Sequence, residues 1–160
     1  MTQQQTQNVN KAARKRVVAV VLALASLALF LAMIFEDIGE FATADWTNLP
    51  VGLIVRYAFA MGLGGALAGY ILAGWFGKSG IFGWLLAFVG GFLATTCAGI
   101  IGSAFGLAPD LLSDGFQASD ILAIAAGAFV LPLAIIGWPI LLPIWLALVG
   151  LAHVLAGKRR

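Results

Sequence analysis

The stretch that decides the fold is residues 51–107, which read VGLIVRYAFAMGLGGALAGYILAGWF, then GKSG, then IFGWLLAFVGGFLATTCAGIIGSAFGL. The two apolar runs, 51–76 and 81–107, are both long enough to cross a hydrocarbon core of about 30 Å, because a helix rises about 1.5 Å per residue. Only the short segment 77–80 separates them. The stretch therefore predicts an antiparallel hairpin of two transmembrane helices.

A third apolar run, residues 17–35, precedes this hairpin without interruption. As a helix it would rise ~28 Å and span the bilayer. A cleaved signal peptide is the alternative, since Ala42-Thr43-Ala44 resembles its A-x-A cleavage site. However, the run exceeds the usual apolar core of a signal peptide, about 7–15 residues. A permanent transmembrane helix is therefore the prediction.

The last apolar run, residues 121–157, is too long for one simple span and contains Pro132, Pro139 and Pro143. Proline removes a backbone donor and tends to kink a helix. The preferred prediction is a re-entrant or outer-surface segment near 121–131, with Ser119 or Asp120 as the N-cap before it, followed by a spanning helix near 133–155. A single tilted and kinked helix and a two-helix hairpin are the alternatives.

Composition agrees with a membrane location. Hydrophobic residues make up 62% of the chain and charged residues 10%, against about 25% charged in a typical soluble domain. The fold class predicted is all-α: a polytopic membrane protein with four transmembrane helices, the second and third as a hairpin and the fourth long and proline-kinked. The net charge of +2 does not indicate a nucleic-acid partner.

The charges divide cleanly between alternate connections of this four-span arrangement. One side carries Lys11, Arg14, Lys15, Arg16, Lys78, Lys158, Arg159 and Arg160; the other carries Glu36, Asp37, Glu40, Asp45, Asp110, Asp114 and Asp120. Lys and Arg resist translocation, so the basic side is predicted to be cytoplasmic. This gives a disordered basic N-terminus at 1–16, a transmembrane domain at 17–157 and a basic tail at 158–160, in a bacterial inner membrane.

Small residues recur along the two hairpin helices at a spacing of four. The sequence predicts a helix-packing face made of Gly65 and Gly69 in the first helix, with Gly83, Gly91, Thr95, Gly99 and Ser103 in the second. A second, partial stripe in the second helix contains Gly90, Ala94, Ala98, Gly102 and Gly106. Small side chains let helix backbones approach closely in lipid. The stripes leave open whether the neighbouring helix belongs to this chain or to another subunit.

Arg56 is the one charge inside an apolar run. Three interpretations stay open: its long stem snorkels to the headgroups, it forms an ion pair with Glu36 or Asp37, or it marks an anion or substrate site.

Residue types needed for catalysis or metal binding are scarce. The chain has one histidine, His153, which is expected at the interface, and one cysteine, Cys97, which is expected to be a buried inert thiol. No acidic residue lies within an apolar run, so neither a metal site nor a cofactor is predicted. The motif 137–143, GWPILLP, could form a broken helix of the kind that builds binding sites in transporters.

Four spans with both ends inside are similar to the layout of the small membrane subunit of tripartite substrate-binding transporters. The resemblance covers layout and no motif, so it implies no site residue. The leading hypothesis is a non-enzymatic accessory subunit or homo-oligomer that packs through its small-residue faces, with the lipid bilayer and a larger membrane protein as partners. The alternative is a small channel or transporter component that uses Arg56 and the broken fourth helix.

Overall fold

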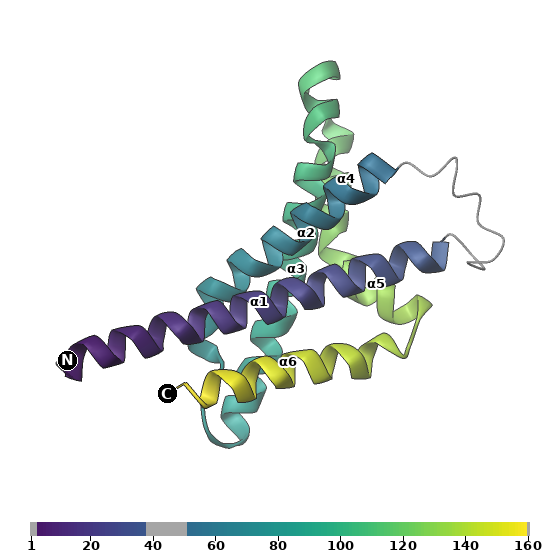
Figure 1. Cartoon of the computed structure of the whole chain (residues 1–160). Helices are drawn as coiled ribbons and strands as arrows, with labels where there is room; N and C mark the ends of the chain where they lie inside the picture. The colour runs from purple at the N-terminus through teal and green to yellow at the C-terminus, as the bar shows by residue number, and fades with distance from the viewer. Residues whose placement is uncertain (1–2, 38–50, 160) are drawn as a thin grey trace.

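The computed structural model describes residues 3–37 and 51–159, and in these ranges the chain forms helices joined by turns, with no strand (Figure 1). The elements are α1 (Gln3–Asp37), α2 (Val51–Leu72), η1 (Ala73–Trp75), α3 (Gly80–Asp114), α4 (Ala118–Ala126), η2 (Gly127–Phe129), α5 (Val130–Gly137) and α6 (Leu141–Gly157). The all-helical class predicted from the sequence is confirmed.

Three of these helices, α1, α2 with η1, and α3, are long and apolar enough to cross a membrane. The fourth apolar helix, α6, has 17 residues and would rise about 25 Å. The chain is therefore a bundle with at least three candidate spans, as the apolar runs at 17–35, 51–76 and 81–107 predicted.

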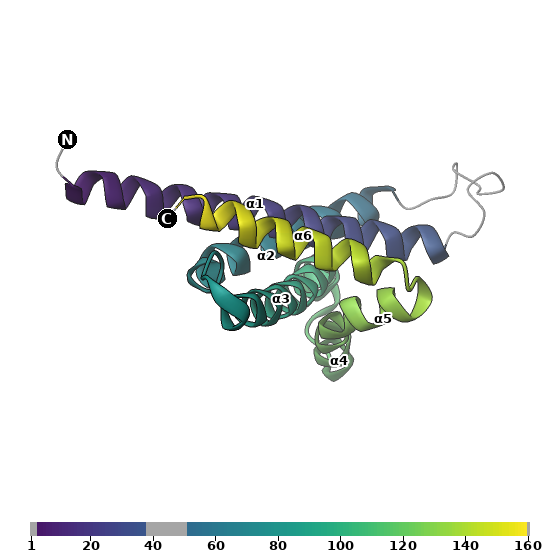
Figure 2. The ribbon, with the colours of Figure 1, turned by 90° about the horizontal axis from the view of Figure 1, so that it is seen from below.

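The long helices pack side by side, and α2 lies between α1 and α3. Helix α6 runs back along α1 and also contacts α3, so that the N- and C-terminal ends of the chain lie toward the same end of the molecule (Figures 1 and 2). The turn between α2 and α3 also lies toward that end (Figure 1).

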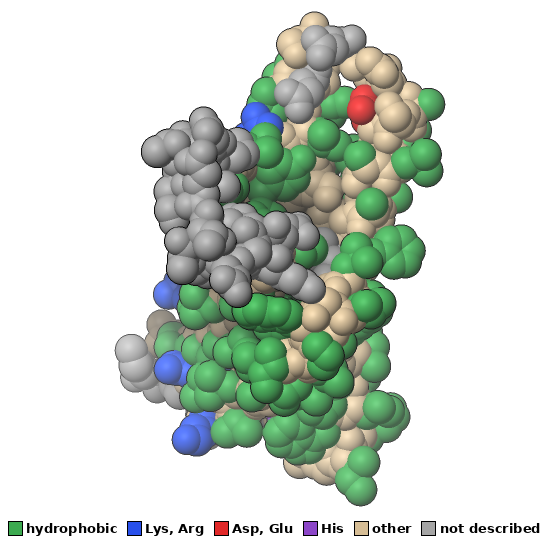
Figure 3. Space-filling model, turned by 90° about the vertical axis from the view of Figure 1, so that its right-hand side faces the viewer, with side chains coloured by type: hydrophobic (Ala, Val, Ile, Leu, Met, Phe, Trp, Pro, Cys, Tyr) green, Lys and Arg blue, Asp and Glu red, His purple; other side chains and the backbone are tan. Residues whose placement is uncertain are grey.

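The core contains large side chains from α1, from α6 and from the residue that follows η1. Leu22, Phe76 and Val149 are fully buried, and small residues such as Ala87 fill the spaces between them. The outward faces are also apolar: Phe59 is 67% exposed and Ile81 is 91% exposed. In the described part of the face shown in Figure 3, most of the side chains are hydrophobic and few are charged. Such an apolar exterior is suited to contact with lipid.

Two helices extend further than the sequence predicted. Helix α1 begins at Gln3, so residues 3–16, expected to be disordered, are helical in the structure. Helix α3 continues past Pro109 to Asp114 and ends at Gly115, whose φ of +80° is a conformation that glycine adopts without steric cost. The connection predicted at 108–120 is therefore confined to residues 115–117.

Helix α4 begins one residue before the predicted N-cap residues. Gln117 is the N-cap, and its backbone N–H donates to Asp120 Oδ2 at 2.7 Å, forming a capping box. The sequence had favoured Ser119 or Asp120 as the cap. Asp120 does stabilise the helix start, but from the third helical position.

The predicted spanning helix near 133–155 is divided in the structure. Helix α5 ends at Gly137, and residues 138–140 form a turn before α6. Trp138 adopts φ −127° and ψ 88°, which is outside the helical region that proline disfavours for the residue before it. The turn satisfies its own backbone, since Trp138 N–H donates to Ala134 O at 2.9 Å and Leu141 N–H donates to Trp138 O at 2.9 Å.

Candidate functional site

The GxxxG face of α2 packs against α1 of the same chain. A Cβ added at Gly65 would lie 2.5 Å from Ser26 Oγ and 2.8 Å from the Leu22 carbonyl oxygen. One added at Gly69 would lie 3.0 Å from Ala19 Cα. Such distances leave no room for a side chain. The two glycines therefore allow the backbones of α1 and α2 to touch.

The predicted stripe of α3 faces the C-terminal half of the chain. A Cβ at Gly91 would lie 2.6 Å from Val149 Cγ2 on α6, while Gly99 and Ser103 are in close contact with Gly127 of η2. Thr95 is turned back on its own helix, where its hydroxyl donates to the carbonyl oxygens of Gly91 at 3.1 Å and Phe92 at 2.9 Å. Gly83 packs against the Lys78 carbonyl in the turn before α3.

The second stripe of α3 faces α2. Gly102 contacts Met61, Gly106 contacts the Tyr57 ring, and a Cβ at Gly64 of α2 would lie 2.9 Å from Ala98 Cα. Both small-residue faces of α3 are therefore occupied by helices of the same chain. A docking surface for another molecule must lie elsewhere.

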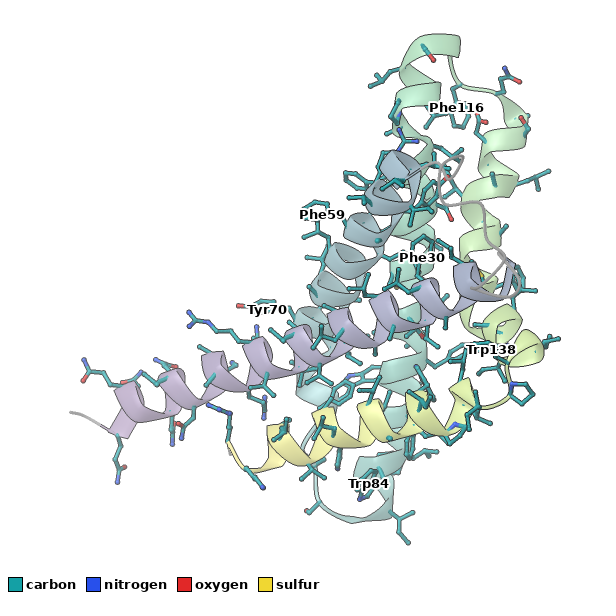
Figure 4. All side chains as sticks on the ribbon, turned by 45° about the vertical axis from the view of Figure 1, so that its right-hand side comes forward. Phe30, Phe59, Tyr70, Trp84, Phe116 and Trp138 are labelled. Carbon is teal, nitrogen blue, oxygen red and sulfur yellow. The ribbon has the colours of Figure 1, made fainter. Side chains whose placement is uncertain are left out.

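A groove on the outer surface of the hairpin provides such a surface. Its wider part is a hollow of about 490 Å³ between α2 and α3, lined by Arg56, Phe59, Ala60, Leu63, Gly64, Leu67, Ile101, Phe105, Ala108 and Pro109. A second hollow of about 260 Å³ shares Leu67 and Ile101 with the first and continues to Leu72 and Leu93. Figure 4 shows Phe59 projecting outward from α2 on this side. Together the two hollows form one apolar groove along the hairpin.

Arg56 lies at the end of this groove nearer to the start of α2. Its Nε atom is buried and has no hydrogen-bond partner among the described residues. The pair predicted with Glu36 or Asp37 involves side chains that lie outside the described part of the chain. All residues lining the 490 Å³ hollow come from α2 and α3, so the structure does not bring Arg56 and the broken segment 137–143 into one hollow.

The turn between α2 and α3 makes a contact with α6 that the sequence did not predict. The backbone N–H of Gly77 donates to His153 Nδ1 at 3.2 Å, and the His153 ring lies 4.6 Å from the Trp84 ring. His153 is only 5% exposed, although it was expected at the interface. A lone histidine carries no signal of such a contact in the sequence, because its partner is a backbone group 76 residues away.

Cys97 is exposed on α3 and lines the narrower part of the groove, so the expectation of a buried thiol was wrong. Within the described residues, no group of three or more His, Cys, Asp or Glu side chains could hold a metal ion.

Comparison of the chain with protein-family models, with curated proteins and with solved structures finds no match in any of the three, so the fold and the groove rest on the geometry of this chain alone.

Proposed function

We propose that the protein is a non-catalytic membrane subunit that receives one transmembrane helix of another membrane protein in the groove between α2 and α3. The observation that carries the proposal is the groove itself, which is apolar and has at one end a guanidinium nitrogen with no hydrogen-bond partner among the described residues. The small-residue faces, through which the sequence predicted packing with a partner, instead pack against helices of the same chain.

The length of the groove favours a helix over a lipid tail as its occupant. From Arg56 to Leu72 the groove follows 16 residue steps of α2, or about 24 Å. This is most of the roughly 30 Å hydrocarbon core, whereas a lipid tail reaches only half of it. A helix lying in a groove buries apolar side chains along its whole length.

Arg56 favours a different protein over a second copy of this chain. Two copies related by a twofold axis along the membrane normal would bring both Arg56 side chains to the same depth in one interface. Like charges repel strongly where water is excluded. A partner helix with a carboxylate near the outer end of its span would instead pair with the guanidinium.

We further propose four spans, with α6 as the fourth, and cytoplasmic N- and C-terminal ends in a bacterial inner membrane. The separation of basic from acidic connections supports this orientation. A periplasm-dependent reporter fused after Arg160 should be inactive, and the same reporter inserted after Asp114 should be active. An active C-terminal fusion would contradict the four-span count.

Filling the groove should remove the partner without unfolding the protein. Leu63 lines the groove and is 50% exposed, so Leu63→Trp adds bulk there without entering the core. We expect the melting temperature in detergent to stay within about 2 °C of wild type, since surface changes cost less than about 0.5 kcal/mol. The stoichiometric partner that co-purifies with wild type from native membranes should be lost.

Leu24→Trp is the matched control, because Leu24 is 56% exposed on α1 and does not line the groove. It should retain the partner. Arg56→Leu should melt like wild type, because no described acceptor contacts Nε, and should lose the partner. Retention of the same partner by both Leu63→Trp and Arg56→Leu would contradict the proposal. The proposal would also be contradicted if the only species lost from these variants were a second copy of this chain.

A further inference from the structure

A separate basic hollow lies at the opposite end of α1 from the acidic residues. It has a volume of about 200 Å³ and is lined by Gln7, Asn10, Lys11, Arg14 and Arg159. Four of these residues follow the spacing i, i+3, i+4, i+7, which places them on one face of α1. Arg159 comes from the chain just after α6. The hollow therefore depends on the two ends of the chain lying together (Figures 1 and 2).

The chemistry of this hollow is that of an anion site. Three of its five lining side chains are cationic, and the other two are amides that can donate hydrogen bonds. Arg14 Nε is buried and has no hydrogen-bond partner among the described residues. Three converging cations repel one another, and an anion in the hollow would relieve that repulsion.

The acidic positions on the described helices lie away from the hollow. Glu36 and Asp37 follow Arg14 by 22 and 23 positions on the same helix, a separation of over 30 Å along α1. The acids of α3 and α4 lie near the junction of those two helices, away from the chain ends (Figure 1). The described residues that line the hollow include no carboxylate, so the hollow is suited to an anion from outside the chain.

The depth of the hollow indicates a lipid as the source. Val18, four residues after Arg14, is fully buried in the bundle and is the second residue of the apolar run 17–35, so Arg14 lies about 6 Å beyond it along the helix. That is the level of lipid headgroups at a bilayer surface. Basic pockets between transmembrane helices at this level suit anionic phospholipid headgroups. At 200 Å³ the hollow is smaller than a typical ligand pocket of about 300–1,000 Å³ and suits a headgroup alone.

We infer that this hollow binds the phosphate headgroup of an anionic phospholipid in the leaflet at the basic end of the bundle. The guanidinium groups of Arg14 and Arg159 and the Lys11 ammonium contact the phosphate oxygens, and the amides of Gln7 and Asn10 donate to it. Lys15 has a different role, since its ammonium lies 4.5 Å from the centre of the Tyr70 ring on α2. The bound lipid would join the N-terminal part of α1 to the C-terminal tail. This inference does not depend on the groove between α2 and α3.

The test is a titration of purified, delipidated protein in mild detergent with phosphatidylglycerol, read as the lipid-dependent rise in melting temperature. Removing one cation near a membrane surface weakens anionic-lipid binding about fivefold, and removing two weakens it about 30-fold. Lys11→Gln with Arg14→Gln should therefore raise about 30-fold the phosphatidylglycerol concentration that gives half of the full rise in melting temperature. Arg159→Gln, which lies outside any helix interior, should raise it about fivefold.

The control pair, Arg16→Gln with Lys78→Gln, removes the same charge at the same end of the bundle from residues that do not line the hollow. It should bind phosphatidylglycerol like wild type. Equal weakening in the control pair would show diffuse charge attraction and overturn the inference. Equal stabilisation by phosphatidylcholine, or by inorganic phosphate alone, would overturn it as well, because the first would show an apolar site and the second a site for a soluble anion.

Discussion

Gly65→Leu is expected to lower the free energy of unfolding by about 3 kcal/mol, at the upper end of the usual cost of overpacking a fitted interface. Even a single added carbon would lie 2.8 Å from the carbonyl oxygen of Leu22. That atom belongs to the backbone of α1, which cannot move aside as a flexible side chain would. The two helices would therefore separate along their length and lose many small dispersion contacts.

Gly62→Leu is the matched control for this substitution. Gly62 lies on the same helix one turn earlier, and no atom lies within 4 Å of a Cβ added there. Both substitutions replace glycine with the same side chain, so a difference between them measures the contact with α1. Thermal melting of the isolated protein in detergent should show a large loss for Gly65→Leu and none for Gly62→Leu. Equal melting temperatures for the two variants would contradict the packing of α2 on α1.

Gly77→Ala is the second substitution with a large expected effect, about 3 kcal/mol of stability. Gly77 has a φ of +76°, a conformation that costs other residues roughly 1–2 kcal/mol. Its added Cβ would also lie 2.7 Å from the backbone of Ala156 and Gly157 at the end of α6. The shift needed to relieve that contact would pull the Gly77 N–H away from His153 Nδ1.

Gly80→Ala separates the two causes. Gly80 has a similar φ of +79°, but no atom lies within 4 Å of a Cβ added there. It should show the backbone cost alone, roughly 1–2 kcal/mol, in the same melting experiment. If Gly80→Ala were as destabilising as Gly77→Ala, the contact between the turn and α6 would contribute nothing to the free energy of unfolding.

The hairpin of α2 and α3 was predictable because its signals are local. Two apolar runs of spanning length and a short glycine-containing turn specify two adjacent antiparallel helices. The face on which each helix packs was less predictable, because α3 has small residues on two faces. Gly91 faces α6 and Gly102 faces α2, and only the arrangement of the other helices assigns each face its neighbour.

The three prolines of the last apolar run explain why its break was misplaced. Pro132 and Pro143 each lie third in their helices, α5 and α6. The first N–H groups of a helix have no partner within the helix, so proline costs little there. Pro139 lies in the turn itself. The sequence shows that the run must bend, but not which proline ends a helix and which two begin one.

The groove and its cation could be anticipated only in part. The sequence identified Arg56 as a candidate site residue because it is a charge in an apolar run. That it shares a hollow with Phe105 and Pro109 depends on how α2 crosses α3. The basic hollow is harder still to foresee, because residues 3–16 are polar and give no apolar periodicity that would predict a helix, and Arg159 approaches them only once α6 has folded back along α1.

The most direct measurement of the central claim, that the small-residue faces pack within one chain and leave the groove free for a partner, is thiol cross-linking between α1 and α2. The rings of Phe30 on α1 and Tyr57 on α2 stack with their centroids 6.3 Å apart, so cysteines at these two positions lie within reach of a short bifunctional thiol reagent, and neither change adds bulk between the helices. In a Cys97→Ala background, Phe30→Cys with Tyr57→Cys should give a cross-link within the monomer, without a dimer band. A cross-linked dimer, or no cross-link in folded protein, would contradict the account.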